Sequence, residues 1–165
     1  MATVPIAEKN EQVKMHECIK ETILEFLNNH NTMSLATSRD NDPYAASLFY
    51  ANDGFTIYFL SNPDSDHSIN FSQNPSVAIT INKDYSEWRM IKGLQIKGRA
   101  CKVSEDELPA AIKSYSKKHP FVKFICRDGN FTFSVIGVQF FKVIPERIRL
   151  IDNEVAFGYK VEIQI

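Results

Sequence analysis

The residues with the clearest chemical potential lie in one short polar stretch, residues 61–68. Ser61, Ser65 and His67 supply hydroxyl and imidazole groups, and Asp64 or Ser65 can cap a helix that follows. The N-terminus of a helix leaves backbone N–H groups without partners and carries the positive end of the helix dipole. A strand that leads into such a helix is a typical anion site, so the stretch predicts a site for a negatively charged group.

Apolar runs on either side predict the elements that position this stretch. Residues 55–60 and 77–82 are short apolar runs bounded by turn residues, which is typical of strands. About two helical turns fit between them. The helix ends at Asn74, because a residue that precedes proline is driven out of the helical region.

The rest of the chain predicts a mainly β protein. After a loose tail over residues 1–10, apolar residues at helical spacing predict a helix over 11–30. A capping box at residues 104–107 opens another helix, which ends near Lys118, and a short helix is possible over 121–126. Further strands are expected at 32–38, 44–51, 94–103, 131–144, 148–151 and 155–165, with a turn at 145–147.

Strands joined by tight turns pair antiparallel, and about seven of them with few helices favour a barrel with flanking helices. A length of 165 residues fits one domain, so we expect residues 1–165 to form a single barrel domain.

Composition excludes several classes of protein. The 20 acidic and 19 basic residues give a formal charge of −1, which argues against a protein that binds nucleic acid by neutralising phosphates. No apolar run is long enough to span a bilayer. Three widely spaced cysteines match neither a zinc pattern nor a disulfide framework, so we expect buried thiols and a cytoplasmic protein.

Several motifs together resemble a known family. Residues 55–78 form a strand, the turn Ser-Asn-Pro-Asp-Ser-Asp-His, and a second strand after Asn-Pro-Ser. Residues 93–100 read Gly-Leu-Gln-Ile-Lys-Gly-Arg-Ala and precede an acidic helix, and residues 141–150 close the pattern. In this order they resemble the FMN-binding split barrel of the pyridoxamine 5′-phosphate oxidase-like superfamily. Residues 46–50 and 157–160, with His67, resemble a bacterial branch of it that has no assigned activity.

The resemblance implies a split barrel of six antiparallel strands. It also implies a homodimer with an FMN at the dimer interface. The flavin ring would rest on the strand 44–50, and the ribityl phosphate would lie near the polar stretch. The cofactor-binding residues that the resemblance implies are Ser47, Phe49, Ser61, Ser65, His67 and Gln95.

One departure from the family pattern concerns charge. Many members have Arg or Lys where this chain has Asp66 and His67, and a fixed cation there neutralises a phosphate dianion. Candidates for the missing cation are Arg89, Lys92 and Lys97.

The sequence therefore predicts an FMN-binding oxidoreductase that acts on a small-molecule substrate. A non-catalytic flavin-binding module is the alternative, as is a relative that binds haem, deazaflavin or FAD. No residue stands out as a general acid or base, and no metal-binding cluster can be assembled. Trp88 is interpreted as a packing or interface residue rather than as a stacking partner for the flavin ring.

Overall fold

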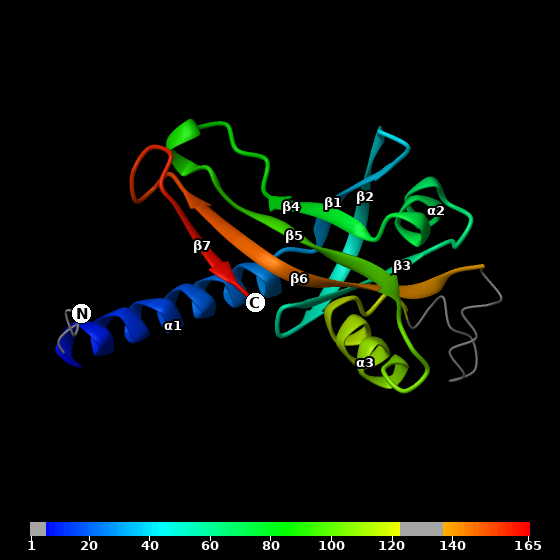
Figure 1. The fold of residues 1–165 in the computed structure, drawn as a ribbon, viewed down its shortest axis with the longest axis horizontal. Coiled ribbons are helices and arrows are strands. Elements are labelled where there is room, and N and C mark those ends of the chain that lie inside the picture. Colours follow the sequence, from blue (N-terminus) through cyan, green and yellow to red (C-terminus); the bar gives the residue numbers. More distant parts are fainter. Residues whose placement is uncertain (1–5, 123–136) are drawn as a thin grey trace, which may run out of the picture.

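The computed structural model describes residues 6–122 and 137–165 (Figure 1). Their elements are, in chain order, α1 (Ile6–Asn29), β1 (Thr32–Arg39), β2 (Asp42–Asp53), β3 (Thr56–Ser61), α2 (Asp66–Gln73), β4 (Ser76–Asn82), the 3₁₀ helix η1 (Trp88–Met90), β5 (Lys92–Lys102), α3 (Leu108–Lys118), β6 (Gln139–Asp152) and β7 (Lys160–Gln164).

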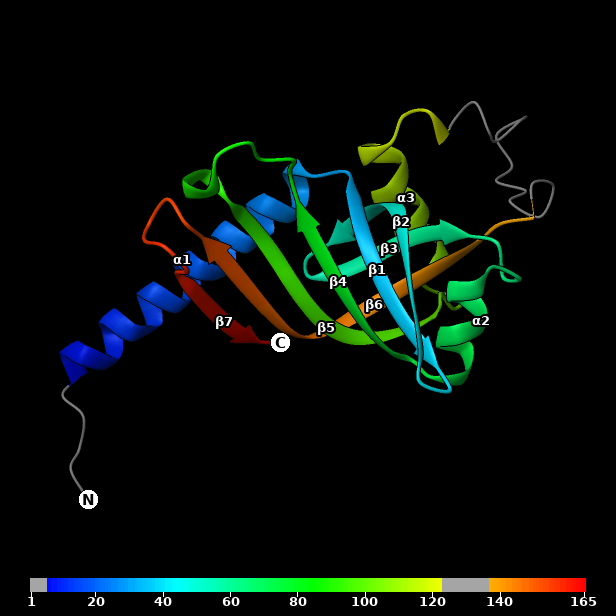
Figure 2. The same ribbon diagram turned by 90° about the horizontal axis from the view of Figure 1, so that it is seen from above.

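The strands form the antiparallel barrel that the sequence predicts. Their order is β3-β2-β1-β4-β5-β6-β7, and a further pairing between β3 and β6 closes a six-stranded ring. β7 lies outside the ring and pairs only with the second half of β6 (Figures 1 and 2). The long β6 pairs with β5 along one edge, and along its other edge it pairs first with β3 and then with β7.

The predicted turn at 145–147 is wrong, because β6 runs through it without a break. Lys97 pairs with Arg147 and Gly98 pairs with Pro145, so Glu146 is an extra residue in a β-bulge. A side chain on Gly98 would place its Cβ 2.4 Å from the carbonyl oxygen of Ile144. The glycine thus allows the close backbone approach that accommodates the proline within the strand.

Other boundaries differ less. α1 begins at Ile6, earlier than the predicted residue 11, and β7 begins at Lys160 rather than at residue 155. The short helix expected at 121–126 and the start of the strand expected from 131 lie mostly outside the described residues.

Alternating burial along the strands fills the barrel. Its core includes Leu35, Phe59 and Ile96, and the second half of α1 covers it with Ile23 and Leu27. The first half of α1 extends beyond the barrel (Figure 2). α3 covers a second apolar cluster on the outside of β2, β3 and β6, which comprises Ala51, Tyr58, Val103, Ala111, Tyr115, Val122 and Phe140.

The expectation of buried thiols is wrong for two cysteines. Cys18 and Cys101 are both exposed, Cys18 near the middle of α1 and Cys101 on the outward side of β5. Cys126 lies outside the described residues. Within 6–122 and 137–165, no helix combines the length and apolar character needed to cross a membrane.

Candidate functional site

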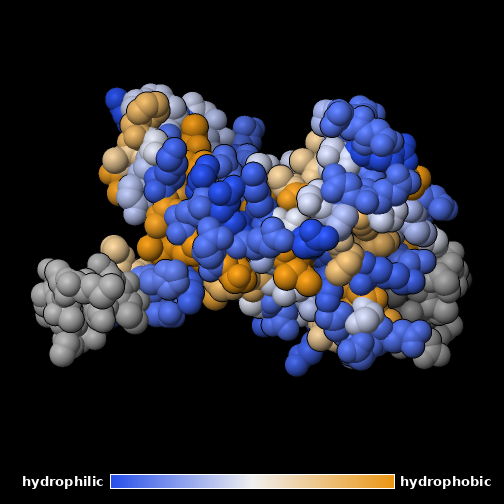
Figure 3. All heavy atoms as spheres, viewed as in Figure 1, coloured by the Kyte–Doolittle hydropathy of each residue, from blue (hydrophilic) through white to orange (hydrophobic). Residues whose placement is uncertain are grey.

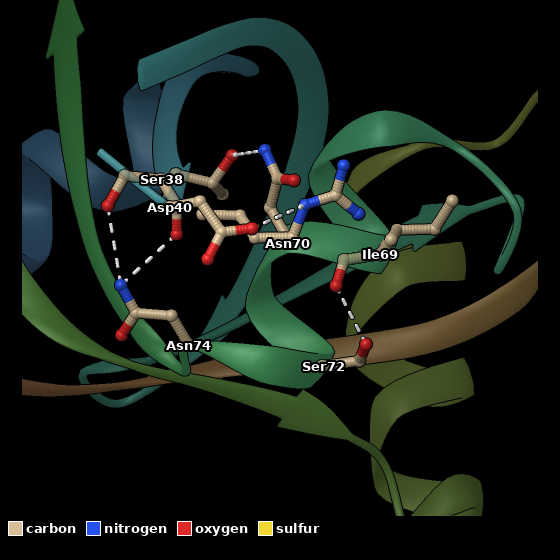
Figure 4. A network of polar contacts seen from close by, with 8 residues as sticks. Ser38, Asp40, Ile69, Asn70, Ser72 and Asn74 are labelled. Atoms are coloured by element: carbon tan, nitrogen blue, oxygen red, sulfur yellow. Dashed lines mark hydrogen bonds and ion pairs between the residues drawn. The ribbon is translucent and has the colours of Figure 1, made fainter. Parts of the chain in front are cut away.

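The short helix α2 is held firmly against the barrel. Asn70 donates to Thr37 Oγ1 over 3.2 Å, and Asn74 donates to the carbonyl oxygen of Ser38 over 3.1 Å (Figure 4). Phe71 packs edge to face against the stacked rings of Phe59 and Phe141 in the core. These contacts fix the N-terminus of α2 beside the end of β3.

A cluster of hydroxyl groups surrounds one imidazole at this N-terminus. Ser61 Oγ lies 2.6 Å and Ser65 Oγ lies 3.1 Å from His67 Nε2. The two serine oxygens are 3.1 Å apart, and Ser68 Oγ lies 2.9 Å from Ser65 Oγ. We call Ser61, Ser65, His67 and Ser68 the hydroxyl–imidazole cluster; the sequence placed three of its four members in one site.

The surroundings of His67 favour its neutral form. Burial lowers the pKa of His67 below its ordinary 6.5 and outweighs the nearby carboxylate of Asp66, which acts in the opposite direction. His67 Nδ1 is buried and has no hydrogen-bond partner among the described residues. The ring faces Tyr44 in a nearly parallel orientation, with ring centres 6.4 Å apart. Because no carboxylate of residues 6–122 or 137–165 orients Nδ1, the pair of Ser61 and His67 does not complete a catalytic triad within this part of the chain.

The predicted cap is only partly present. Ser65 occupies the N-cap position of α2, but its side chain makes no capping hydrogen bond. Its hydroxyl instead donates to the carbonyl oxygen of Asn62 over 2.8 Å. The first-turn N–H groups of α2 are therefore not capped by a side chain, which suits an anionic ligand.

A phosphate fits this cluster by hydrogen bonding rather than by charge. Hydroxyl groups, first-turn N–H groups and the unpartnered imidazole nitrogen can all serve the phosphate oxygens. No Lys or Arg side chain bonds to the cluster within the described part of the chain. Of the three candidate cations, Lys92 is paired with Asp152 and Arg89 lies over the ring of Trp88, whereas Lys97 forms no ion pair among the described residues.

Ser47 and Gln95 lie in a different place. Cross-strand pairing puts them in one row on the outward face of the barrel, which runs Ser47, Ser34, Thr80, Gln95, Arg149 and Glu162. Tyr44 and Ser47 are an odd number of residues apart, so they point to opposite faces of β2. Ser61 shares the inward side of β3 with Ile57 and Phe59.

Phe49 follows Ser47 on the same outward face and is 50% exposed. Its ring lies against His119 and Phe121, with ring centres 5.4 Å and 5.5 Å apart. The six predicted residues therefore form two groups: three in the hydroxyl–imidazole cluster, and three on the outward face of β2 and β5.

The sequence did not single out several residues that shape these groups. Ser68 and Asn70 are polar and buried on a short helix, which was a usable signal. The cationic part of the outward face was harder to foresee because it depends on strand register. It comprises Lys97, which the sequence did offer as a candidate cation, together with Arg99, Arg147 and Arg149; the two last pair with Glu162.

Comparison with known proteins identifies the family. A profile of the pyridoxamine 5′-phosphate oxidase family matches residues 19–152. A UPF0306 protein of Campylobacter jejuni is 36% identical over 106 residues, which cover 63% of this chain and 75% of that protein.

Two solved structures share the fold. A heme binding protein from Mycobacterium smegmatis has a TM-score of 0.67 at 18% identity, covering 85% of this chain and 57% of that one. A FAD-binding protein from Mesorhizobium loti has a TM-score of 0.60 at 19% identity, covering 76% and 88%. With the barrel, the order of the motifs and the profile match in agreement, the chain belongs to the pyridoxamine 5′-phosphate oxidase family.

Proposed function

We propose that the protein is an FMN-binding oxidoreductase that acts on a small-molecule substrate as a homodimer. The observation that carries the proposal is the uncapped N-terminus of α2 beside Ser61, Ser65 and the unpartnered Nδ1 of His67. Hydrogen-bond donors converge there, as the phosphate of a flavin requires.

The positions of the two groups of predicted residues support the proposed homodimer. One group lies where β3 ends and α2 begins, and comprises Ser61, Ser65 and His67. The other group faces outward from β2 and β5, and comprises Ser47, Phe49 and Gln95. A second copy of the chain that supplies one of the groups would let a single flavin contact both. A cofactor at an interface between two copies would have this arrangement.

The protein's part in the reaction is binding and orientation. A bound flavin supplies the electron transfer itself. The hydroxyl–imidazole cluster and the N–H groups of α2 hold the phosphate, and Ser47 and Gln95 offer hydrogen bonds to the polar edge of the ring system. Exposed thiols such as Cys18 and Cys101 suit a reducing compartment, in line with a cytoplasmic location.

The absorption spectrum of the protein purified from cells tests the proposal, together with mass spectrometry of whatever denaturation releases. Flavin bands near neutral pH and released FMN are expected. A haem spectrum would contradict the FMN proposal and would match the heme binding protein from Mycobacterium smegmatis. Release of FAD or a deazaflavin would show that the cofactor is not FMN.

Turnover separates the enzyme from a flavin-binding module. Reduction of bound FMN by NADH or NADPH, followed by reoxidation, is expected of an oxidoreductase. Tight FMN binding with no reduction by either nucleotide would show a binding module instead.

Ser61→Ala combined with Ser65→Ala weakens FMN binding about tenfold or more, because two hydrogen bonds to a charged group are lost.

A further inference from the structure

A cavity opens on the side of the barrel that α3 covers. It has a volume of about 900 Å³ and lies between the end of α1, the β2–β3 turn and one side of α3. This size is within the range of small-molecule sites. None of the six predicted cofactor residues lines it. Its lining comprises Leu24, Asn28, Asn31, Asn52, Asp53, Gly54, Ala110, Lys113, Ser114, Lys117 and Lys118.

The cavity carries an excess of positive charge. Lys113, Lys117 and Lys118 line it from α3, and Asp53 is its one carboxylate. None of these four side chains belongs to an ion pair among the described residues. Like charges one helical turn apart repel each other, so an anion between them lowers the free energy of this side of α3.

Lys118 forms the inner wall of the cavity. Its ammonium group donates to the carbonyl oxygen of Leu27 over 2.7 Å and to Asn52 Oδ1 over 3.4 Å, and it lies 3.9 Å from the ring centre of Tyr50. Burial lowers the pKa of Lys118 to about 8. A half-buried ammonium group that faces a cavity without a counter-ion is stabilised by a bound anion.

Side-chain amides complete the polar wall. Asn52 Nδ2 donates to Asn28 Oδ1 over 3.1 Å and to the carbonyl oxygen of Gly54 over 3.1 Å. The amide nitrogen of Asn28 and the side chain of Asn31 have no hydrogen-bond partner among the described residues. Free amide donors and acceptors of this kind match hydroxyl groups on a ligand.

From the lysines, the amides and the volume together, we infer that this cavity binds a phosphorylated, polyhydroxylated small molecule. The phosphate lies between Lys113, Lys117 and Lys118, and the hydroxyl groups meet Asn28 and Asn31. Two simpler ligands should bind more weakly. An uncharged sugar leaves the lysines without a counter-ion, and inorganic phosphate makes no hydrogen bonds to the amides.

Titration of the full chain with ribose 5-phosphate tests this inference, with ribose and inorganic phosphate as comparison probes. Binding is followed by calorimetry and by the amide NMR signals of α3 and the β2–β3 turn. Saturable binding is expected for ribose 5-phosphate, at least about tenfold tighter than for either comparison probe. The double variant Lys113→Ala, Lys117→Ala changes two exposed side chains and weakens binding about tenfold or more.

The matched control is Lys102→Ala, Lys160→Ala, which removes the same charge from exposed positions on β5 and β7. Unchanged binding in this control supports the site, and equal weakening in both double variants overturns it. Absence of saturable binding by all three probes also overturns it, as does inorganic phosphate binding as tightly as ribose 5-phosphate. FMN binding by the Lys113, Lys117 variant stays at the wild-type level, because neither lysine is among the residues assigned to the flavin.

Discussion

At His67 the surroundings decide which protonation state the protein offers to a ligand. The side chain is buried, its Nε2 atom is held by two serine hydroxyls, and its Nδ1 atom has no partner in the described part of the chain. Burial favours the neutral ring. A phosphate dianion beside it favours the charged ring, so ligand binding and proton uptake are coupled.

The affinity for FMN is therefore expected to fall as the pH rises. In the free protein the pKa of His67 lies below 6.5, and the bound phosphate raises it. At a pH between these two pKa values, FMN binding is accompanied by proton uptake. The affinity for FMN therefore declines as the pH rises through this range, and it levels off above the pKa of the complex. A shift of one pKa unit changes the dissociation constant about tenfold. Fluorescence titration with FMN between pH 5 and pH 8 measures this.

His67→Lys is the control for this effect, since it keeps a cation throughout that range. The variant binds FMN more tightly at pH 8 and keeps only the shallow, opposite dependence that arises from the second ionisation of the phosphate, at a pKa of about 6. Equal pH profiles in the wild type and in this variant would remove His67 from the phosphate site.

Sequence reasoning succeeded at residue scale where the relevant contacts are local. Ser61, Ser65 and His67 are within seven positions of one another, so a strand, a turn and a helix start suffice to bring them together. The bond from Asn70 to Thr37 joins positions far apart in the chain and depends on how α2 docks. No local pattern predicts such a contact.

Among the elements, β6 shows how a single glycine permits a fold feature. Pro145 is a strand breaker by propensity, and the sequence accordingly suggested a turn. The break was avoided by a bulge on β6 opposite Gly98, in another strand. Strand identities were predictable from alternation, whereas the continuity of β6 depended on a cross-strand contact.

Gly98→Ala is expected to destabilise the barrel by about 3 kcal/mol, because its Cβ would clash with the backbone of Ile144 and Pro145. Urea unfolding measures the loss. Gly54→Ala is the matched control, because Gly54 has a positive φ of 54° but nothing within 4 Å of an added Cβ. It costs only about 1 kcal/mol of backbone strain. Similar losses for both variants would refute the clash at the bulge.

The start of α3 depends on Glu107. Its carboxylate accepts from the hydroxyl of Ser104 over 2.6 Å and pairs with Lys142 of β6, which lowers its pKa from 4.5 to about 2, the pair with Lys142 contributing most. The predicted capping box is thus present in part, with the carboxylate bound back to Ser104.

Because the folded pKa is depressed, this contribution is complete above about pH 4.5 and is lost as the pH falls toward 2. The protection of the first-turn amides of α3 against exchange, relative to their intrinsic rates at each pH, is expected to fall over that range. In Glu107→Gln this protection is already lower at pH 6 and changes less on acidification. If wild type and variant exchange equally at pH 6, the carboxylate does not anchor α3.

For the whole molecule, the exposed apolar side chains bear on assembly. Two loops, the β4–β5 connection and the β6–β7 loop, meet at one end of the barrel, where Figure 3 shows apolar atoms at the surface. Asn153 ties the loops together by donating to the carbonyl oxygens of Trp88 and Ile91. The exposed patch comprises Trp88, Met90, Ile91, Val155, Phe157 and Tyr159. A braced patch of this kind is typical of an interaction surface.

We expect this patch to contribute to the proposed homodimer. Trp88 and Phe157 are 48% and 80% exposed, and their rings meet edge to face with centres 5.1 Å apart. Large aromatic residues commonly dominate the energy of an interface, at about 2 kcal/mol or more each.

Trp88→Ser with Phe157→Ser should raise the dimer dissociation constant about a hundredfold or more, as measured by sedimentation equilibrium. Met15→Ser, which changes a side chain 63% exposed on the first half of α1, should leave it unchanged. If the double variant remains as dimeric as the wild type, the two copies meet elsewhere. If the wild type is a monomer with FMN bound, one copy suffices for the site and the interface proposal fails.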